Sequence, residues 1–361
     1  MNLIGQNIHK LETPELIIDL DVVDANFNTV SNAYKDSHLK MRTHTKNLKS
    51  PFLARQQVNA GGSNGGVCTA KVSEAEIMVE SGFDNILIAN QVVSNDKIER
   101  LCSLAKIADM KVGIDNLDNL QNLSKFAYKH NVILGVLVEI NTSMFRCGVR
   151  SSKDAVELAK LANELPNIEF KGVMSHQSIS GSPTEQERWE IGKGYIDILL
   201  NAKKAIEEAG IDIQIVSTGE TFTFDIVLEY PEITEVQGGT YALMDVNYPY
   251  MPFDIAARVM SSVIDINISQ DLITLDSGSK CIAAPNFAKP ILEGQDAELI
   301  DMRLDHSVYK VSDVNKYELG QKLFLLTTHQ DGMINRWDKF VGYRKDEVQG
   351  VWDILGRGCH H

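Results

Sequence analysis

A group of basic and imidazole side chains ends the first strand-like run of the sequence, KMRTHTK at 40-46, where Arg42, His44 and Lys46 alternate. Burial and neighbouring positive charge both lower the pKa of a lysine, so a lysine in such a place is readily deprotonated and becomes a nucleophile. We therefore select Lys46 as a candidate nucleophile, with a solvated basic loop as the alternative. Arg42 has the same strand parity as Lys46, and either a substrate carboxylate or an external salt bridge would account for it.

Small residues end the seventh and eighth strand-like runs, in the segments STGET at 217-221 and GGTY at 238-241. Small side chains allow backbone N–H groups to approach an anion closely. In a parallel barrel, the loops after the last two strands are where phosphate groups commonly bind. The two segments together favour a phosphate site over two ordinary glycine turns.

The elements that must position these residues follow from a regular alternation. From residue 40 onward, short runs rich in Val and Ile alternate with longer amphipathic stretches, which is typical of parallel strands covered by helices. The predicted strands are 40-46, 66-70, 85-90, 111-115, 134-140, 170-176, 213-219 and 235-241, and the predicted helices include 73-81, 95-107, 117-129, 153-164 and 184-209. Eight such runs favour an α/β fold with a closed (β/α)8 TIM-type barrel, and a doubly wound open sheet is the alternative.

The sequence pattern changes after about residue 255, where strand-like segments follow one another without long helices between them. This pattern predicts a C-terminal all-β domain, onto which the N-terminal segment packs. We expect a barrel domain at 22-255 and a β domain formed by 1-21 and 256-361.

The composition excludes several classes of partner. A net charge of -14 would repel nucleic acid and anionic membranes, which need clustered Lys and Arg. The five cysteines are an odd number without paired spacing, which argues for reduced thiols, and no apolar stretch suggests a signal peptide or membrane span. We expect a cytoplasmic protein that acts on a small molecule.

Six segments give the sequence a specific resemblance, and they occur in the order RTHTKNLKSP, GVCTAKVSEAE, ILIANQVV, VLVEINTSMFRCGV, QGGTYALMDVNY and LTTHQDGMIN. These segments resemble those of the metal-dependent D-threonine aldolase and D-serine dehydratase family, within the alanine-racemase-like, fold type III class of pyridoxal-phosphate enzymes. The resemblance extends from about residue 12 to the C-terminus. It implies a barrel that binds pyridoxal 5'-phosphate, a C-terminal β domain, a homodimer, and a substrate among D-configured β-hydroxy amino acids.

The resemblance also implies roles for particular residues. Lys46 would form the internal aldimine, Arg146 would contact the cofactor's phenolate oxygen, and Gln177 would line the cofactor pocket. The residues implied in phosphate binding are Thr218, Gly219, Glu220, Thr221, Gly239, Thr240 and Tyr241.

His329 and Asp331 stand where the family binds a divalent cation. If this segment is a strand, its period-two spacing points both side chains the same way, and imidazole with carboxylate suits manganese, zinc or magnesium. A surface strand is the alternative for an isolated pair of this kind. The dehydratase branch tends to carry Cys at the second ligand, so Asp331 favours the aldolase branch.

The sequence departs from the family pattern at several positions. Thr43 and Leu48 replace a Pro and a His near Lys46, and Ile179 replaces a Tyr after the sixth strand, with no His following it. Gly332 replaces the usual Pro after the second metal ligand. His306 lies where the family has a His, and it suits either an acid–base role or that of a structural histidine.

Four functions remain open at this stage. The first is a lyase that cleaves Cα–Cβ to give glycine and an aldehyde or keto acid, and the second is a dehydratase with the same lysine, cofactor and metal. The third is a metal-independent amino-acid racemase, and the fourth is a protein that binds the cofactor without catalysis. Asp331 places the aldolase first.

Overall fold

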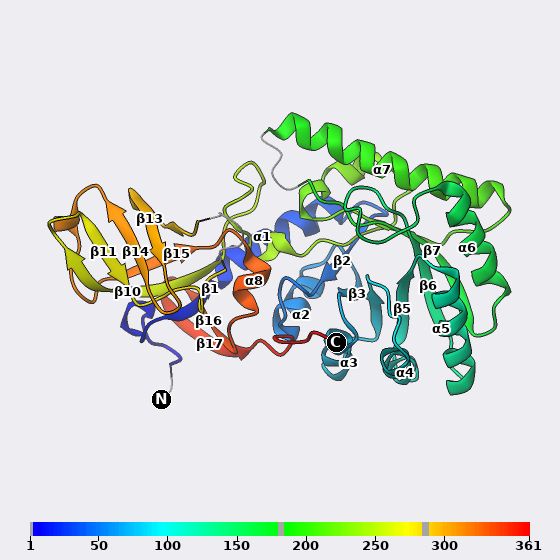
Figure 1. Ribbon diagram of the computed structural model, residues 1–361, viewed down its shortest axis with the longest axis horizontal. Helices are drawn as coiled ribbons and strands as arrows, with labels where there is room; N and C mark the ends of the chain where they lie inside the picture. The colour runs from blue at the N-terminus through cyan, green and yellow to red at the C-terminus, as the bar shows by residue number, and fades with distance from the viewer. Residues whose placement is uncertain (1–2, 180–183, 284–288) are drawn as a thin grey trace. The chain divides into compact units, whose positions relative to one another are not determined.

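The structure is a computed structural model, and it describes residues 3–179, 184–283 and 289–361 (Figure 1). The described residues form two compact units. The barrel unit comprises those within 30–46, 53–239 and 359–361, and the sheet unit comprises those within 1–29, 47–52 and 240–358.

Eight parallel strands form a closed barrel, in which the eighth strand pairs with both the seventh and the first. The strands are β2 (Lys40–His44), β3 (Ser63–Thr69), β4 (Asn85–Ile88), β5 (Asp109–Ile114), β6 (Leu134–Glu139), β7 (Ile168–Met174), β8 (Ile215–Thr218) and β9 (Glu235–Val236). Each of the eight predicted runs overlaps one of these strands, although β3, β5 and β7 begin two or three residues before the predicted runs. The closed barrel is therefore confirmed, and the open-sheet alternative is excluded.

Helices follow most of the barrel strands: α2 (Pro51–Ala60), α3 (Val72–Glu80), α4 (Asn95–Leu104), α5 (Leu117–His130), α6 (Ser152–Glu164) and α7 (Glu185–Glu208). Polar residues cap several of them. Asn116, Ser151 and Thr184 accept a backbone N–H three residues ahead with their side chains. After β8, short 3-10 helices replace a long helix, namely η2 (Thr221–Thr223) and η3 (Ile226–Glu229).

The barrel interior is apolar in the middle and polar where the strands begin. Cys68, Leu87, Leu137 and Met174 are fully buried and contact one another. Burial raises the pKa of Cys68 to about 12, so this thiol is a core residue and not a nucleophile.

Arg42 lies among the polar groups near the strand beginnings. Its guanidinium pairs with both carboxylate oxygens of Glu235, at 2.8 and 2.9 Å, and also donates to Asn85. Only 2% of Arg42 is exposed, and Gly66 leaves the space for it, because a Cβ there would lie 2.4 Å from Nη1. Both roles expected for Arg42 are therefore wrong: it forms a buried ion pair inside the barrel.

The sheet unit contains a nine-stranded sheet. Seven of its strands follow the order β13-β14-β11-β10-β1-β16-β17, and of the other two, β15 pairs with β10 and β12 pairs with β15. Its strands are β1 (Glu15–Asp19), β10 (Ala257–Asn267), β11 (Leu272–Leu275), β12 (Ile291–Leu292), β13 (Ala297–Met302), β14 (Ser307–Val311), β15 (Lys322–Leu326), β16 (Lys339–Arg344) and β17 (Glu347–Asp353). The C-terminal part is mostly rather than entirely β, because it also holds the short helix α8 (Gln330–Ile334).

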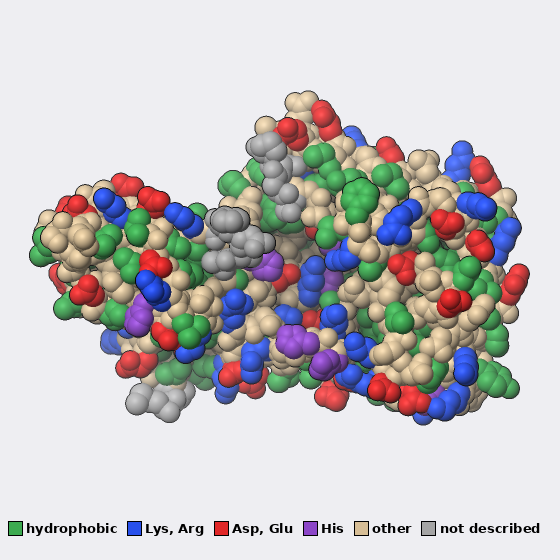
Figure 2. Space-filling view, viewed as in Figure 1, with side chains coloured by type: hydrophobic (Ala, Val, Ile, Leu, Met, Phe, Trp, Pro, Cys, Tyr) green, Lys and Arg blue, Asp and Glu red, His purple; other side chains and the backbone are tan. Residues whose placement is uncertain are grey.

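Helix α1 (Leu20–Tyr34) follows β1 without an intervening loop and was not among the predicted helices. Within the described ranges, no helix combines the length and apolar character needed to cross a membrane. All five cysteines are free thiols. On the face shown in Figure 2, acidic and basic side chains are interspersed.

Candidate functional site

Lys46 lies two residues beyond the end of β2, so the C-terminal edge of the barrel positions it. It is half-buried, and its backbone N–H lies 3.5 Å from Nδ1 of the buried His44. In a parallel barrel this edge is where catalytic groups gather. The structure therefore places the candidate nucleophile where the sequence predicts it.

His176 follows β7 at the same edge and was not among the candidates from the sequence. Burial, together with the positive charges of Lys46 and Arg146, lowers its pKa to about 3. The imidazole is therefore neutral at physiological pH and lies within the field of two cations. The signal that would have found it is its position, directly before Gln177 and after the end of a strand.

Gln177 is fully buried beside the end of β8. Its Nε2 donates to Thr218 Oγ1 at 3.2 Å, and this hydroxyl also shares a hydrogen bond of 2.6 Å with Ser175. The Oε1 atom of Gln177 has no partner among the described residues. A buried polar atom left unpaired costs about 1–3 kcal/mol, so this amide suits contact with a bound group.

Arg146 lies exposed in the loop after β6, close enough for its charge to act on both His176 and Glu139. Glu139 is buried at the end of β6 and accepts a hydrogen bond of 2.5 Å from Gln91. Burial raises the pKa of this carboxyl. Two cations, a neutral imidazole and an unpaired amide oxygen together fit an anionic ring cofactor such as pyridoxal 5'-phosphate.

The loop after β8 has the compact conformation that its small residues predict. Gly219 has φ +84, which favours glycine, and a Cβ there would lie 3.2 Å from Thr223 Oγ1. The backbone N–H of Glu220 donates to the same hydroxyl at 3.0 Å, and Thr221 begins η2. Thr218 and Thr221 are buried.

The second predicted phosphate loop continues from the buried Gly239 into η4 (Thr240–Ala242). In the sheet unit, Thr240 Oγ1 accepts a hydrogen bond of 3.0 Å from the Asn47 amide. The Tyr241 ring is buried against Phe27 and Phe253, with centroids 6.1 and 5.3 Å away. Its aromatic ring packs in the core, so a role with phosphate would use its backbone.

His329 and Asp331 are not on a strand, and this part of the prediction is wrong. Strand β15 ends at Leu326, and His329 instead caps helix α8, which contains Asp331. On a helix, residues two apart differ in direction by about 200°, so spacing alone does not bring these two side chains together.

Asp245 connects the two candidate ligands within the sheet unit. Burial raises the pKa of its carboxyl, Asp331 raises it further, and His329 lowers it, so all three groups interact. In the part of the chain that the structure describes, no cluster of three or more His, Cys, Asp or Glu is arranged to hold a metal. His329 and Asp331 would thus supply two protein ligands, one fewer than catalytic zinc sites usually have, and would leave the other positions to water or substrate.

The conformation of His329 sets a condition on metal binding. Its Nδ1 accepts the N–H of Gly332 at 3.0 Å. A neutral imidazole whose Nδ1 accepts carries its proton on Nε2. A cation can therefore bind at Nδ1 only after the Gly332 hydrogen bond is broken, and at Nε2 only after the proton moves to Nδ1, which breaks the same bond.

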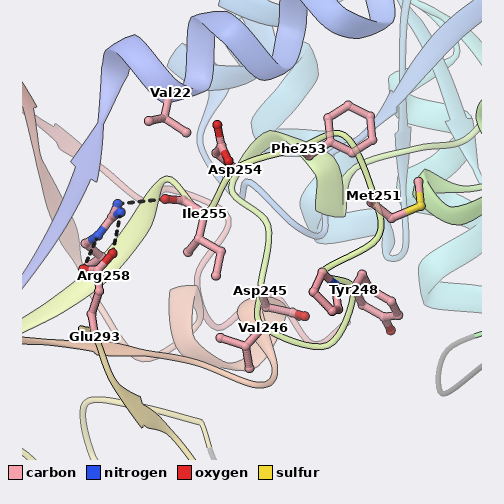
Figure 3. A pocket seen from close by; sticks show the side chains of 11 residues that line it. Val22, Asp245, Val246, Tyr248, Met251, Phe253, Asp254, Ile255, Arg258 and Glu293 are labelled. Atoms are coloured by element: carbon pink, nitrogen blue, oxygen red, sulfur yellow. Dashed lines mark hydrogen bonds and ion pairs between the residues drawn. The ribbon is translucent and has the colours of Figure 1, made fainter. Parts of the chain in front are cut away.

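A cavity of about 540 Å³ lies in the sheet unit, and Asp245 forms part of its wall (Figure 3). Tyr248, Met251 and Phe253 give it an apolar side. The ion pair between Arg258 and Glu293 lies at another part of the wall. The cavity is large enough for a small molecule.

Two predicted features of the site remain, namely His306 and the loop that follows Ile179. His306 is exposed in the turn between β13 and β14, where its carbonyl accepts the Arg303 N–H at 2.8 Å. Ile179 is buried, and residues 180–183 of the loop expected to lack a His lie outside the described ranges.

A closed (β/α)8 barrel with a mostly β C-terminal sheet, and with lysine and imidazole at the C-terminal edge of its strands, defines an alanine-racemase-like barrel protein. The chain belongs to the family described as alanine racemase, N-terminal domain, whose model matches residues 18–245. Family membership implies pyridoxal 5'-phosphate as the cofactor.

Several proteins are similar to this chain over most of its length. A 3-hydroxy-D-aspartate aldolase from Paracoccus denitrificans (strain Pd 1222) is 31% identical over 98% of this chain and 94% of its own. A D-threonine aldolase from Arthrobacter sp. is 30% identical over 98% and 95%. A more distant D-threo-3-hydroxyaspartate dehydratase from Delftia sp. (strain HT23) is 26% identical over 74% and 72%.

The crystal structure of D-threonine aldolase from Filomicrobium marinum has a similar fold. The two chains superpose with a TM-score of 0.94, at 29% sequence identity, over 99% of each.

Proposed function

We propose that this protein is a pyridoxal-phosphate-dependent lyase that cleaves D-configured β-hydroxy-α-amino acids to glycine and an aldehyde or α-keto acid. The observation that carries the proposal is the similarity to two named aldolases over 98% of the chain. The site supports it, since Lys46 lies at the barrel edge beside a neutral His176.

Most of the residues that would hold the cofactor belong to the barrel unit, and Thr240 and Tyr241 belong to the sheet unit. Lys46 supplies the amine to which the cofactor attaches, and Arg146 and Gln177 supply the polar contacts around the ring. The phosphate would be held by Thr218, Gly219, Glu220 and Thr221, with Gly239, Thr240 and the backbone of Tyr241. When bound, pyridoxal 5'-phosphate accepts the electron pair released when a bond to the substrate's Cα breaks.

The chain's own groups then position the substrate and move its protons. The Lys46 amine can return a proton to Cα of the product. His176 stays uncharged, because burial and two cations oppose its protonation, so it can accept or donate a hydrogen bond without adding charge. His306 is a weaker candidate for acid–base work, because its exposed turn leaves it solvated.

His329 and Asp331 would hold a divalent cation, and we propose manganese, zinc or magnesium. Such a cation lowers the pKa of a coordinated β-hydroxyl, which makes loss of the hydroxyl proton easier. The carboxylate of Asp331, in place of a cysteine, favours oxygen-preferring ions.

Product analysis tests the proposal. Purified protein with pyridoxal 5'-phosphate is given D-threonine, D-serine and D-3-hydroxyaspartate in turn, with chelator or with added manganese. Glycine formed only in the presence of metal is expected. Racemised substrate that forms equally well with chelator would replace the lyase by a racemase, and no turnover of any kind would leave a cofactor-binding protein.

Dehydration is the second candidate, since a dehydratase is among the more distant relatives. It needs the same lysine, cofactor and metal, and it ends in ammonia and a keto acid instead of glycine. The same experiment separates the two reactions by their products.

The cellular location, the oligomeric state and the partners are also proposals. We propose a cytoplasmic homodimer that acts on a small amino acid and binds neither nucleic acid nor membranes, in keeping with a net charge of -14 and interspersed surface charges. We keep the domain boundaries as 22-255 for the barrel, with 1-21 and 256-361 for the β domain that carries the metal ligands.

A further inference from the structure

Asn47 makes three hydrogen bonds inside the sheet unit, and 2% of it is exposed. Its Nδ2 donates to Oδ1 of Asp331 and, at 3.0 Å, to Oγ1 of Thr240. Its backbone carbonyl accepts from Nε2 of Gln330. One side-chain amide therefore joins a candidate metal ligand to a candidate phosphate residue.

Asp331 needs such a contact, because the helix that carries it is short. Helix α8 has five residues, Gln330–Ile334, and a helix of that length has little stability of its own in water. Without an external partner, the carboxylate would sample several rotamers. The Asn47 amide fixes Oδ1, and Oδ2 keeps its lone pairs for a cation.

The geometry of an amide makes this bond directional. The two N–H groups of one amide lie in a plane and point apart. With one N–H on Thr240, the direction of the other toward Asp331 is set. Gln330, next to Asp331, holds the backbone of Asn47 in return, so the two segments position each other.

Asn47 directly follows Lys46 in the sequence. The same short segment thus carries the candidate nucleophile and the group that positions the candidate metal ligand.

We propose that Asn47 is a positioning residue that orients the Asp331 carboxylate for a divalent cation and ties it to Thr240. This inference rests on the metal site of the proposed function. Outer contacts of this kind typically change metal affinity by about 10- to 100-fold when they are removed.

The test measures the affinity for Mn²⁺ itself, by electron paramagnetic resonance of the free ion, on the full-length protein loaded with pyridoxal 5'-phosphate. Asn47→Ala removes both amide donors and should raise the Mn²⁺ dissociation constant by about 10- to 100-fold. Saturating Mn²⁺ should restore most of the turnover, because the lysine and the cofactor residues are unchanged.

Asn26→Ala is the matched control. Asn26 is also 2% exposed and lies in the same unit, but its amide bonds to the backbone of Ala242 and Asp254. It should lose stability as Asn47→Ala does, yet keep the wild-type Mn²⁺ affinity. If Asn47→Ala does not fold, by circular dichroism, Asn47→Ser replaces it, since its hydroxyl is too short for the same contact but can be hydrated.

Two results would overturn the inference, and they are distinguishable. Wild-type affinity in the folded Asn47 variant, together with weakened binding in Asp331→Ala, rejects the role of Asn47 and keeps the metal site. Equal affinity in wild type and Asp331→Ala rejects the metal site, and the role of Asn47 with it.

Discussion

At the scale of single residues, the candidate site consists of charged and neutral side chains around Lys46. Burial and the positive charges of Lys46 and Arg146 together keep His176 neutral. The sequence makes Lys46 a candidate because it ends a predicted strand in a basic cluster. It does not identify His176, whose low pKa comes from burial and from charges in the loops that follow two other strands.

Lys46 provides the first prediction. Lys46→Ala should fold, lose all turnover and lose the visible absorbance of a lysine-bound cofactor, because no other amine occupies that position. Absorption spectra and circular dichroism of the purified variant check this. Lys40→Ala, at the other end of β2, is the control and should keep the colour. Full colour and activity in Lys46→Ala would contradict the assignment.

The second prediction concerns the stability of the folded protein at acidic pH. The pKa of His176 is about 3 in the folded protein, against an ordinary value of 6.5. Between these values the unfolded chain binds a proton that the folded chain does not. This residue therefore makes stability fall as the pH drops from 6.5 toward 3, with a slope of up to about 1.4 kcal/mol per pH unit.

Urea unfolding between about pH 7 and about pH 5 measures this effect, with ordinary histidine titration near 6.5 as the reference. His176→Gln should show a smaller loss of stability on acidification than wild type. The exposed His38 gives the control variant His38→Gln, which should follow wild type. Identical slopes in all three proteins would show that His176 is not held neutral by the fold.

At the scale of elements, local patterns predict what local forces stabilise. The eight barrel strands are short apolar runs between amphipathic helices, and all eight are present. Helix α8 was missed because its five residues are too few for a periodic signal, and its start depends on the His329 cap. Hydrogen bonds such as Asn47 to Asp331 join residues far apart in the chain, so no local pattern contains them.

The third prediction concerns His329, the residue that caps helix α8. A Cβ on Gly332 would lie 2.8 Å from His329 Nδ1 and 2.9 Å from Ala283 Cβ. Gly332→Ala should therefore displace the His329 ring and weaken Mn²⁺ binding, measured by titration of the free ion. In contrast, a Cβ on Gly194 in α7 meets nothing within 4 Å.

Gly194→Ala is accordingly the control. It should stabilise the protein by about 0.5–1 kcal/mol, as expected for alanine in a helix interior, and leave Mn²⁺ binding unchanged. Unaltered metal affinity in Gly332→Ala would mean that the ring of His329 can move without consequence for the cation.

At the scale of the whole molecule, the buried ion pair between Arg42 and Glu235 joins the first and last strands of the barrel. Strand β9 has only two residues, so backbone pairing contributes little at this seam. The side-chain pair adds two hydrogen bonds there, and Asn64 adds a third to Glu235 at 2.7 Å.

The fourth prediction tests the seam. Glu235→Gln keeps the side-chain volume but leaves the Arg42 charge buried without its partner, which should cost about 3–5 kcal/mol of unfolding free energy. Glu208→Gln is the control, because its pair with Lys204 is exposed at 3.8 Å and should matter by less than about 0.5 kcal/mol. A loss below about 1 kcal/mol in Glu235→Gln would contradict a role for the pair in closing the barrel.

The seam also has a consequence for synthesis on the ribosome. Arg42 and Glu235 are separated by 193 positions in the chain. Because a chain emerges from its N-terminus, the guanidinium of Arg42 leaves the exit tunnel long before its carboxylate exists outside. A nascent chain that extends past Thr218 but not yet to Glu235 carries seven of the eight barrel strands with two open edges, which is the kind of surface that chaperones recognise.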